Sequence, residues 1–281
     1  MYDDRFVCFI DILGFKELIT ASALPIEPDK LLPLGDDRPR SAKGILGILN
    51  NLRFCLELHK DAHYDPESDR YKELIKYTQP VFKKGDIPDF QFNFFSDSIV
   101  FSVNRLNLET IKLFCNLVER ITSLLFECSS ACRGGIAFGK LYHKDNIVFG
   151  PAMIEAYKIE QEAIYPRIII SKDIIASLSK NELSRLKKIW ITQDDDQQFF
   201  IDIIKSYASC DKYNETVTSF THCMHWLLSL HLKHKCLKTC DKYNWYRVRF
   251  NALLKRVKKF VKTECPDKAY REEFLNLPYF K

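Results

Sequence analysis

The chain has 281 residues, of which 46% are hydrophobic and 28% are charged, and its mean hydropathy is −0.21. These values exclude a disordered chain, and no run of the sequence reaches the roughly 18 apolar residues that cross a membrane. The first five residues are acidic where a secretion signal would be basic, so we expect a cytoplasmic protein whose ten cysteines are reduced.

Charge divides the chain into two parts. Residues 205–281 carry 16 Lys and Arg against 7 Asp and Glu, whereas residues 1–204 carry 26 against 30. We therefore predict two units, a domain over 1–204 and a basic helical extension over 205–281. Because few aromatic residues interleave the basic ones, we expect a solvated helical face rather than a nucleic-acid surface.

The first half of the predicted elements begins with an apolar strand over residues 5–12, which Gly14 ends before a helix over 15–23. Apolar residues at helical spacing predict a second helix over 41–63. Residues 64–89 are polar with three prolines, and they predict an irregular insert. A hairpin follows, with strands over 90–95 and 99–103 and Ser96-Asp97-Ser98 at its tip.

The second half of the predicted elements also alternates between strands and helices. The predicted elements are a helix over 108–126, strands over 131–138 and 146–149, a helix over 152–162, a strand over 166–170, a helix from 171, a hairpin over 189–192 and 198–204, and helices over 215–235 and 241–262. The order strand, helix, hairpin, helix, strand predicts an α+β fold. Its core would be a ferredoxin-like palm, with an antiparallel central sheet flanked by helices.

Two aspartates stand at the ends of apolar, strand-forming runs. Asp11 lies one residue before the end of the first strand, and Asp97 lies at the hairpin tip. In a ferredoxin-like palm these two positions are neighbours, and a pair of carboxylates there suits Mg²⁺ or Mn²⁺. The alternative is a structural role for each, Asp11 as a helix N-cap and Asp97 as an ordinary turn residue.

Two further segments add features that suit phosphate groups. Gly14 and Phe15 open a helix directly after the first strand, and a helix N-terminus favours anions. Arg133, followed by Gly134 and Gly135, supplies a cation beside a backbone that other groups can approach closely. Together with the aspartates, these segments indicate chemistry on nucleotides.

The residue sequences and the order of four motifs resemble those of the class III nucleotide cyclase catalytic domain. They are Phe-Ile-Asp-Ile-Leu-Gly-Phe from Phe9, Phe-Ser-Asp-Ser from Phe95, Arg-Gly-Gly-Ile-Ala-Phe-Gly from Arg133, and Phe-Gly-Pro-Ala-Met-Ile-Glu-Ala-Tyr-Lys-Ile-Glu from Phe149. In detail they look like the pyrimidine cyclases of Pycsar anti-phage systems, and the resemblance covers about residues 5–204.

The resemblance implies a role for each matching residue. Asp11 and Asp97 match the aspartates that bind two Mg²⁺ or Mn²⁺ ions, and the backbone carbonyl of Ile12 matches a further metal ligand. The residues that match phosphate-binding positions are Gly14, Phe15 and Arg133.

Four positions bear on the base and on the reaction itself. Asn93 falls where purine cyclases read the base, and its amide suits a pyrimidine edge. Ile147 and Ile154 replace a second base-reading residue and a ribose-orienting Asn, which puts a purine pocket in doubt. Lys158 stands where a transition-state Arg is expected, and it keeps the charge but loses the bidentate fork. Arg133 and Lys158 are the candidate catalytic residues.

The resemblance implies that the chain converts UTP, favoured over CTP, into a cyclic monophosphate and pyrophosphate. It also implies a homodimer with shared sites and a separate effector that the cyclic nucleotide activates. Two alternatives stay open: a catalytically inactive cyclase-like scaffold, suggested by Ile154 and Lys158, and a polymerase relative with a nucleic-acid-binding tail.

Overall fold

A computed structural model describes residues 1–22, 45–47, 49–53, 56, 89–104, 107–127, 130–208, 215–233 and 237–280 of the chain. The predicted insert over 64–89 lies outside these residues except for Asp89. Of the helix predicted over 41–63, the described positions 45–47, 49–53 and 56 are helical.

An eight-stranded sheet forms the centre of the fold, in the order β2-β3-β1-β4-β6-β8-β7, and β5 pairs with β4 outside this path. All neighbours are antiparallel except β4 and β6, which are parallel. The strands are β1 (Asp3–Leu13), β2 (Gln91–Phe95), β3 (Ser98–Val103), β4 (Ala131–Lys144), β5 (Ile147–Phe149), β6 (Ile168–Ile170), β7 (Ile191–Gln193) and β8 (Phe199–Ile201).

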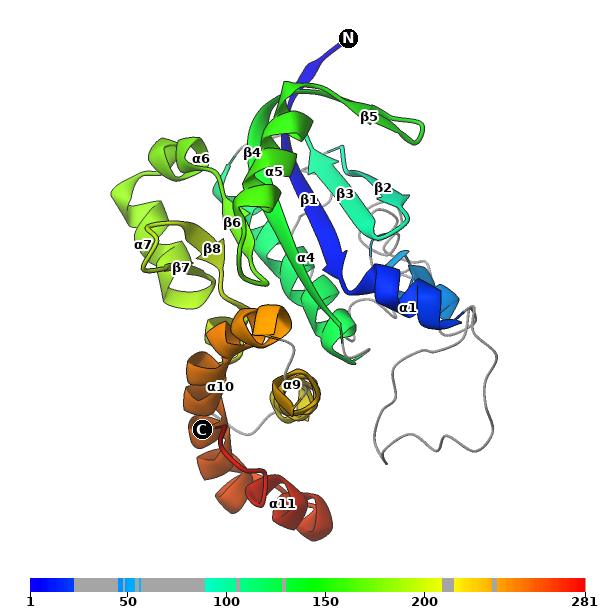
Figure 1. Cartoon of the computed structure of the whole chain (residues 1–281). Coiled ribbons are helices and arrows are strands. Elements are labelled where there is room, and N and C mark those ends of the chain that lie inside the picture. Colours follow the sequence, from blue (N-terminus) through cyan, green and yellow to red (C-terminus); the bar gives the residue numbers. More distant parts are fainter. Residues whose placement is uncertain are drawn as a thin grey trace, which may run out of the picture.

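Helices cover both faces of the sheet, so the fold is α+β as predicted (Figure 1). They are α1 (Phe15–Ser22), α4 (Leu108–Glu127), α5 (Pro151–Glu162), α6 (Lys172–Ser177), α7 (Lys180–Ile189), α8 (Ile203–Ala208), α9 (Glu215–Lys233), α10 (Leu237–Glu264) and α11 (Lys268–Leu275). Among the described residues, no helix combines the length and the apolar character needed to cross a membrane.

The central strand β1 explains the two-layer core. Successive side chains of a strand point to opposite faces, so β1 contributes to both helical layers. Phe6, Cys8 and Ile10 enter the larger core with α4, α9 and α10, whereas Val7 and Phe9 pack in the smaller core under α5. Because both faces are covered, the strand is almost continuously apolar in sequence.

Helix α5 rests almost directly on the backbone of β4. A Cβ atom built on Gly135 would lie 2.2 Å from the carbonyl oxygen of Ala156 and 2.8 Å from Cβ of Ile159. Only a glycine allows this approach, and Ala152 and Ala156 on the helix keep the contact close. Gly135, the second glycine of the Gly-Gly pair, therefore sets the position of α5.

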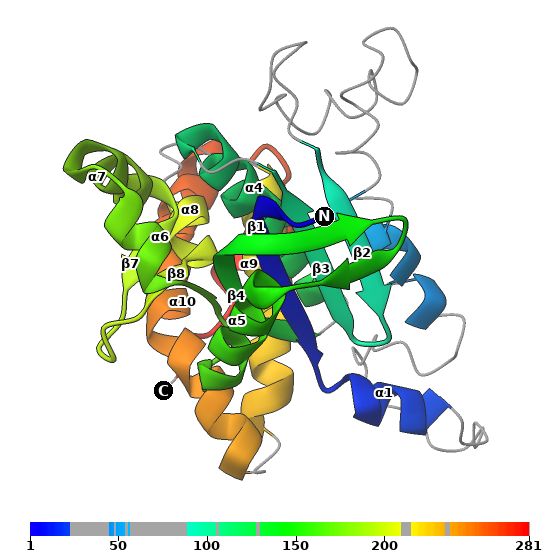
Figure 2. The same ribbon diagram turned by 90° about the horizontal axis from the view of Figure 1, so that it is seen from above.

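The β4–β5 hairpin extends over the sheet from its far end. Figure 2 shows this ribbon running across β1, β3 and β2. His143 near the tip of β4 consequently contacts Ser102 on β3 and Asn93 on β2. The end of β4 thereby covers polar residues on the same face of the sheet as α5.

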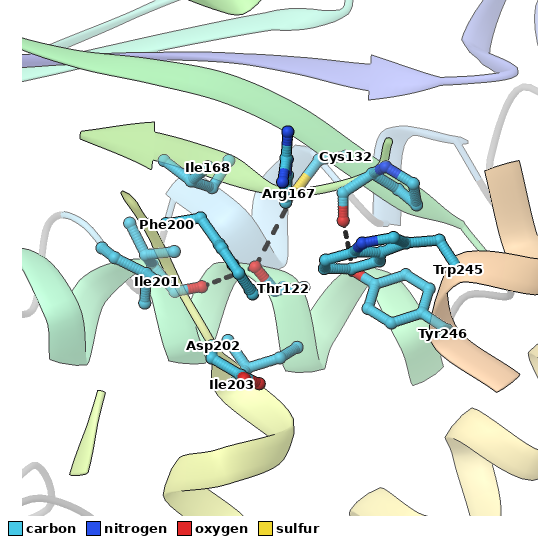
Figure 3. Close-up of a pocket in the computed structure, with 12 residues that line it drawn as sticks. Thr122, Cys132, Arg167, Ile168, Phe200, Ile201, Asp202, Ile203, Trp245 and Tyr246 are labelled. Carbon is cyan, nitrogen blue, oxygen red and sulfur yellow. Dashed lines mark hydrogen bonds between the residues drawn. The ribbon is translucent and has the colours of Figure 1, made fainter. Parts of the chain in front are cut away.

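The basic extension packs on the sheet through α9 and α10. The Tyr246 hydroxyl donates a hydrogen bond to the carbonyl oxygen of Pro166, and Trp245 and Arg249 both bond to Asp194 in the β7–β8 turn. Figure 3 shows the cavity beside these contacts, lined also by Cys132 and Arg167. Its volume of about 10 Å³ has room for one water molecule, which excludes a nucleotide.

Two expectations for the second half were wrong in detail. The strand predicted over 198–204 ends at Ile201, because Asp202 accepts a hydrogen bond from the backbone N–H of Lys205 and starts α8. The helix predicted from 171 divides into α6 and α7, since Ser179 and Glu182 form a capping box that begins α7. The proposed boundary at 204 falls inside α8, and the division into two units stays a prediction.

We predict that Gly135→Ala destabilises the protein by about 3 kcal/mol, because the new methyl group collides with rigid helix backbone. Gly47→Ala is the matched control, since nothing lies within 4 Å of its Cβ position in a helical segment and alanine there stabilises by up to about 1 kcal/mol. Urea denaturation of the three proteins measures both effects. Equal stability of Gly135→Ala and wild type would contradict the close contact.

Candidate active site

The two predicted aspartates lie together at one end of the sheet. Asp11 stands between Ser98 on β3 and Arg133 on β4. Asp97 occupies the β2–β3 turn, and its carbonyl oxygen accepts a hydrogen bond of 2.9 Å from the backbone N–H of Ile12. The hairpin tip is thus fastened to the end of the central strand, next to Asp11.

Burial and neighbouring charge determine how Asp11 titrates. Burial raises the pKa of this carboxyl above its ordinary value. The charge of Arg133 opposes that rise, the charge of Asp97 adds to it, and Lys242 on α10 contributes a smaller lowering. Asp97 therefore lies close enough to Asp11 for the two carboxyl groups to interact.

The chain turns sharply after this strand. Gly14 has a φ of +78°, a conformation that side chains disfavour, and α1 begins at the next residue. Phe15 is buried in the larger core and anchors the start of the helix. The side chain of Ile12 is buried in the same core. The phosphate-binding roles of Gly14 and Phe15 and the metal-binding role of the Ile12 carbonyl stay predictions.

The site also contains a buried glutamate, Glu160, which the sequence analysis did not single out. Glu160 on α5 is fully buried, and its Oε1 lies 2.6 Å from Nε of Arg133 in an ion pair without hydrogen-bond geometry. The same Nε lies 3.4 Å from Oδ2 of Asp11. Arg133 is thus held between two carboxylates. Burial raises the pKa of Glu160, and Arg133 opposes the rise.

The sequence carried a signal for Glu160. Ala152, Ala156 and Glu160 follow one another at intervals of four residues, so they share one helix face. All three are buried against the sheet. A charged residue on the same stripe as two small ones indicates a buried charge that needs a partner.

Lys158 faces away from this cluster. It is exposed on α5, and residues two apart on a helix do not share a face, so Lys158 and Glu160 point in different directions. Within the described residues, Lys158 forms no ion pair. Its helix neighbour Ile154 is 58% exposed, and Tyr157 is also exposed. One copy of the chain therefore does not bring Lys158 to Asp11.

Asn93 lies apart from the carboxylates on β2. Its side chain is 6% exposed, and its Oδ1 lies 3.3 Å from Nε2 of His143. Asn93 is thus a buried residue with a defined partner and not a polar residue that faces solvent at a strand end. A base-binding role for Asn93 stays a prediction.

Comparison with known proteins adds little to this geometry. No protein-family model and no curated protein matches the sequence. Among solved structures, the chain is similar to a bacterial light-regulated adenylyl cyclase, with 9% sequence identity and a TM-score of 0.37 over 79% of this chain and 99% of that one. A similarity at this level supports no argument about the activity of this chain.

We predict that Glu160→Gln raises the stability of the protein at neutral pH. A carboxyl whose pKa is higher in the folded state binds more protons when folded, so stability falls as the pH rises through that pKa, and the amide removes the fall. Thermal unfolding at several pH values between about 4 and 8 measures this dependence.

Glu182→Gln is a control of opposite sign. Hydrogen bonds from Ser179 lower the pKa of this exposed capping glutamate, so its loss reduces stability at neutral pH. Identical pH profiles for Glu160→Gln and wild type would contradict the buried charge at Glu160.

Proposed function

We propose that this chain is a pyrimidine nucleotide cyclase, which converts UTP, or CTP, into the 3′,5′-cyclic monophosphate and pyrophosphate. The observation that carries the proposal is the meeting of Asp11 and Asp97 at the end of β1, with Arg133 on the adjacent strand. The antiparallel order β4-β1-β3-β2 supports our interpretation of this part of the sheet as a ferredoxin-like palm.

The donor set fits divalent cations. The carboxylate of Asp11, which burial penalises and which interacts with that of Asp97, gains from a bound cation, and oxygen ligands suit Mg²⁺ and Mn²⁺. We propose that Asp11, Asp97 and the carbonyl of Ile12 hold two such ions. When bound, the ions would make the ribose 3′-hydroxyl more acidic and neutralise charge on the triphosphate.

The residues around the carboxylates would position and stabilise the substrate. Gly14 and the start of α1 present backbone N–H groups to the phosphates. Arg133 would exchange its contact with Asp11 for the phosphates once cations neutralise that carboxylate, while Glu160 keeps its guanidinium in place. Each such contact with developing charge contributes about 3–4 kcal/mol to lowering the barrier.

We further propose a homodimer in which Lys158 of one copy completes the site of the other. The exposure of Lys158 on the face of α5 away from Asp11 supports this arrangement. Apolar residues also lie exposed around that face, as expected of a contact between copies. They are Ile147, Phe149, Ile154 and Tyr157.

The wider role rests on the resemblance alone. We propose a cytoplasmic enzyme, with catalytic residues in 1–204 and a helical extension in 205–281. Its cyclic nucleotide would act as a second messenger in anti-phage defence and activate a separate effector.

The first experiment is incubation of the purified chain with ATP, GTP, CTP or UTP and Mn²⁺, with products identified by mass. We expect a cyclic pyrimidine monophosphate, and Asp11→Ala should lower its formation by about 100-fold or more without unfolding the protein. Cyclic purine products would refute the pyrimidine assignment. Absence of any product, together with no thermal stabilisation by nucleotide and Mn²⁺, would refute the cyclase and favour the scaffold.

The shared site predicts complementation between two inactive variants. A dimer of one Asp11→Ala chain and one Lys158→Ala chain contains one intact site and one doubly defective site. Random mixing should therefore restore roughly a quarter of wild-type activity. The control is a mixture of Asp11→Ala with Asp97→Ala, both on the same side of the site, which should stay inactive. Failure of the first mixture to gain activity would contradict the shared site.

A further inference from the structure

A chain of buried polar side chains runs beneath the β4–β5 hairpin. Nε of Arg5 donates to Oγ of Ser102 at 2.9 Å, Oγ of Ser102 lies 2.7 Å from Nδ1 of His143, and Nε2 of His143 lies 3.3 Å from Oδ1 of Asn93. All four side chains are buried. Asp89 accepts a further hydrogen bond from Arg5 and fixes the outer end of the chain.

The direction of these hydrogen bonds follows from Arg5. A guanidinium only donates, so Ser102 accepts from Arg5, and we assign the hydroxyl hydrogen that Ser102 has left to donate to Nδ1 of His143. Nδ1 is then the accepting nitrogen, and Nε2 carries the hydrogen. Nε2 donates to Oδ1 of Asn93, so the oxygen of that amide is occupied from within the protein.

The register of the sheet shows on which side of Asn93 His143 lies. On β3, Ser98 pairs with Asp11, Val100 pairs with Asn93, and Ser102 lies farther along. His143 bonds both Ser102 and Asn93, so it meets Asn93 on the side away from Asp11. The amide nitrogen and oxygen of Asn93 diverge from one carbon, so the nitrogen is directed away from His143, which lies on the side of Asn93 opposite Asp11.

The distance between Asn93 and Asp11 matches the size of one nucleotide. Asn93 and Asp11 are two strands apart across the sheet and two residues apart along it, which corresponds to about 10 Å and about 7 Å. A nucleoside triphosphate whose phosphates lie at Asp11 can place its base near Asn93.

We infer that the Arg5-Ser102-His143 chain holds Asn93 as a hydrogen-bond donor to the base and thereby selects uracil over cytosine. This inference rests on the proposed function. At C4, uracil carries an oxygen that accepts a hydrogen bond, whereas cytosine carries an amino group that donates one. The Asn93 amino group matches the first and leaves the second unpaired. His143 is a positioning residue that touches Asn93 and not the substrate.

The test is competition between equimolar UTP and CTP with Mn²⁺, read as the ratio of the two cyclic products. We expect the full chain to favour UTP by about 10-fold or more. Asn93→Asp presents only accepting oxygens and should reverse the preference. His143→Phe frees the amide to rotate, so the ratio should move toward one, while His143→Gln keeps a donor and should largely restore it.

His222→Phe is the matched control, because His222 lies on α9 near Glu273, outside the chain of hydrogen bonds, and its replacement should leave the ratio unchanged. A wild-type preference for CTP, or an unchanged ratio in His143→Phe, overturns the inference while leaving the cyclase intact. If His143→Phe does not fold, an unaltered ratio in Asn93→Asp overturns it as well. Loss of all product and of all nucleotide binding in the wild type would instead remove the proposed function itself.

Discussion

The pairing of β1 on both of its edges is the constraint on which the candidate site depends. Eleven residue pairs join β1 to β4, and six join it to β3. The strand is also covered on both faces, so a shift of register by one residue would exchange its two core faces. Asp11 therefore keeps one fixed place between Ser98 and Arg133, and the turn carrying Asp97 follows from the same register.

The buried charges at this end of the sheet lower the stability of the folded protein. Asp11 and Glu160 both lie where burial disfavours their ionised forms, and one guanidinium serves the two of them. A structural core would place apolar residues at such positions. Paired carboxylates in a strained electrostatic balance are typical of sites that bind cations or charged substrates.

The sequence predicted the strands and helices of the sheet well because their signals are local. Apolar runs, Gly14 and the Ser96-Asp97-Ser98 tip located β1, β2 and β3, and the motifs located Asp11, Asp97 and Arg133. Such local patterns do not predict contacts between residues that are far apart in the sequence. The bond of Asn93 to His143 depends on the path of the β4–β5 hairpin, and α8 was missed because a capping role for Asp202 competes with the strand pattern. Helix α11 carries no strong apolar period, and only its N-cap Asp267 marks it.

The packing of the last residues against α9 and α10 bears on how the protein is made. Asn251 exchanges two hydrogen bonds with the backbone of Phe280, His225 bonds the carbonyl of Pro278, and these helices in turn complete the core beneath the sheet. During synthesis the sheet and α4 emerge before α9 and α10, so the larger core is incomplete when the strands have been made. Phe280 packs against this core, so the contacts that join α9 and α10 to the last residues form only after Phe280 has been synthesised.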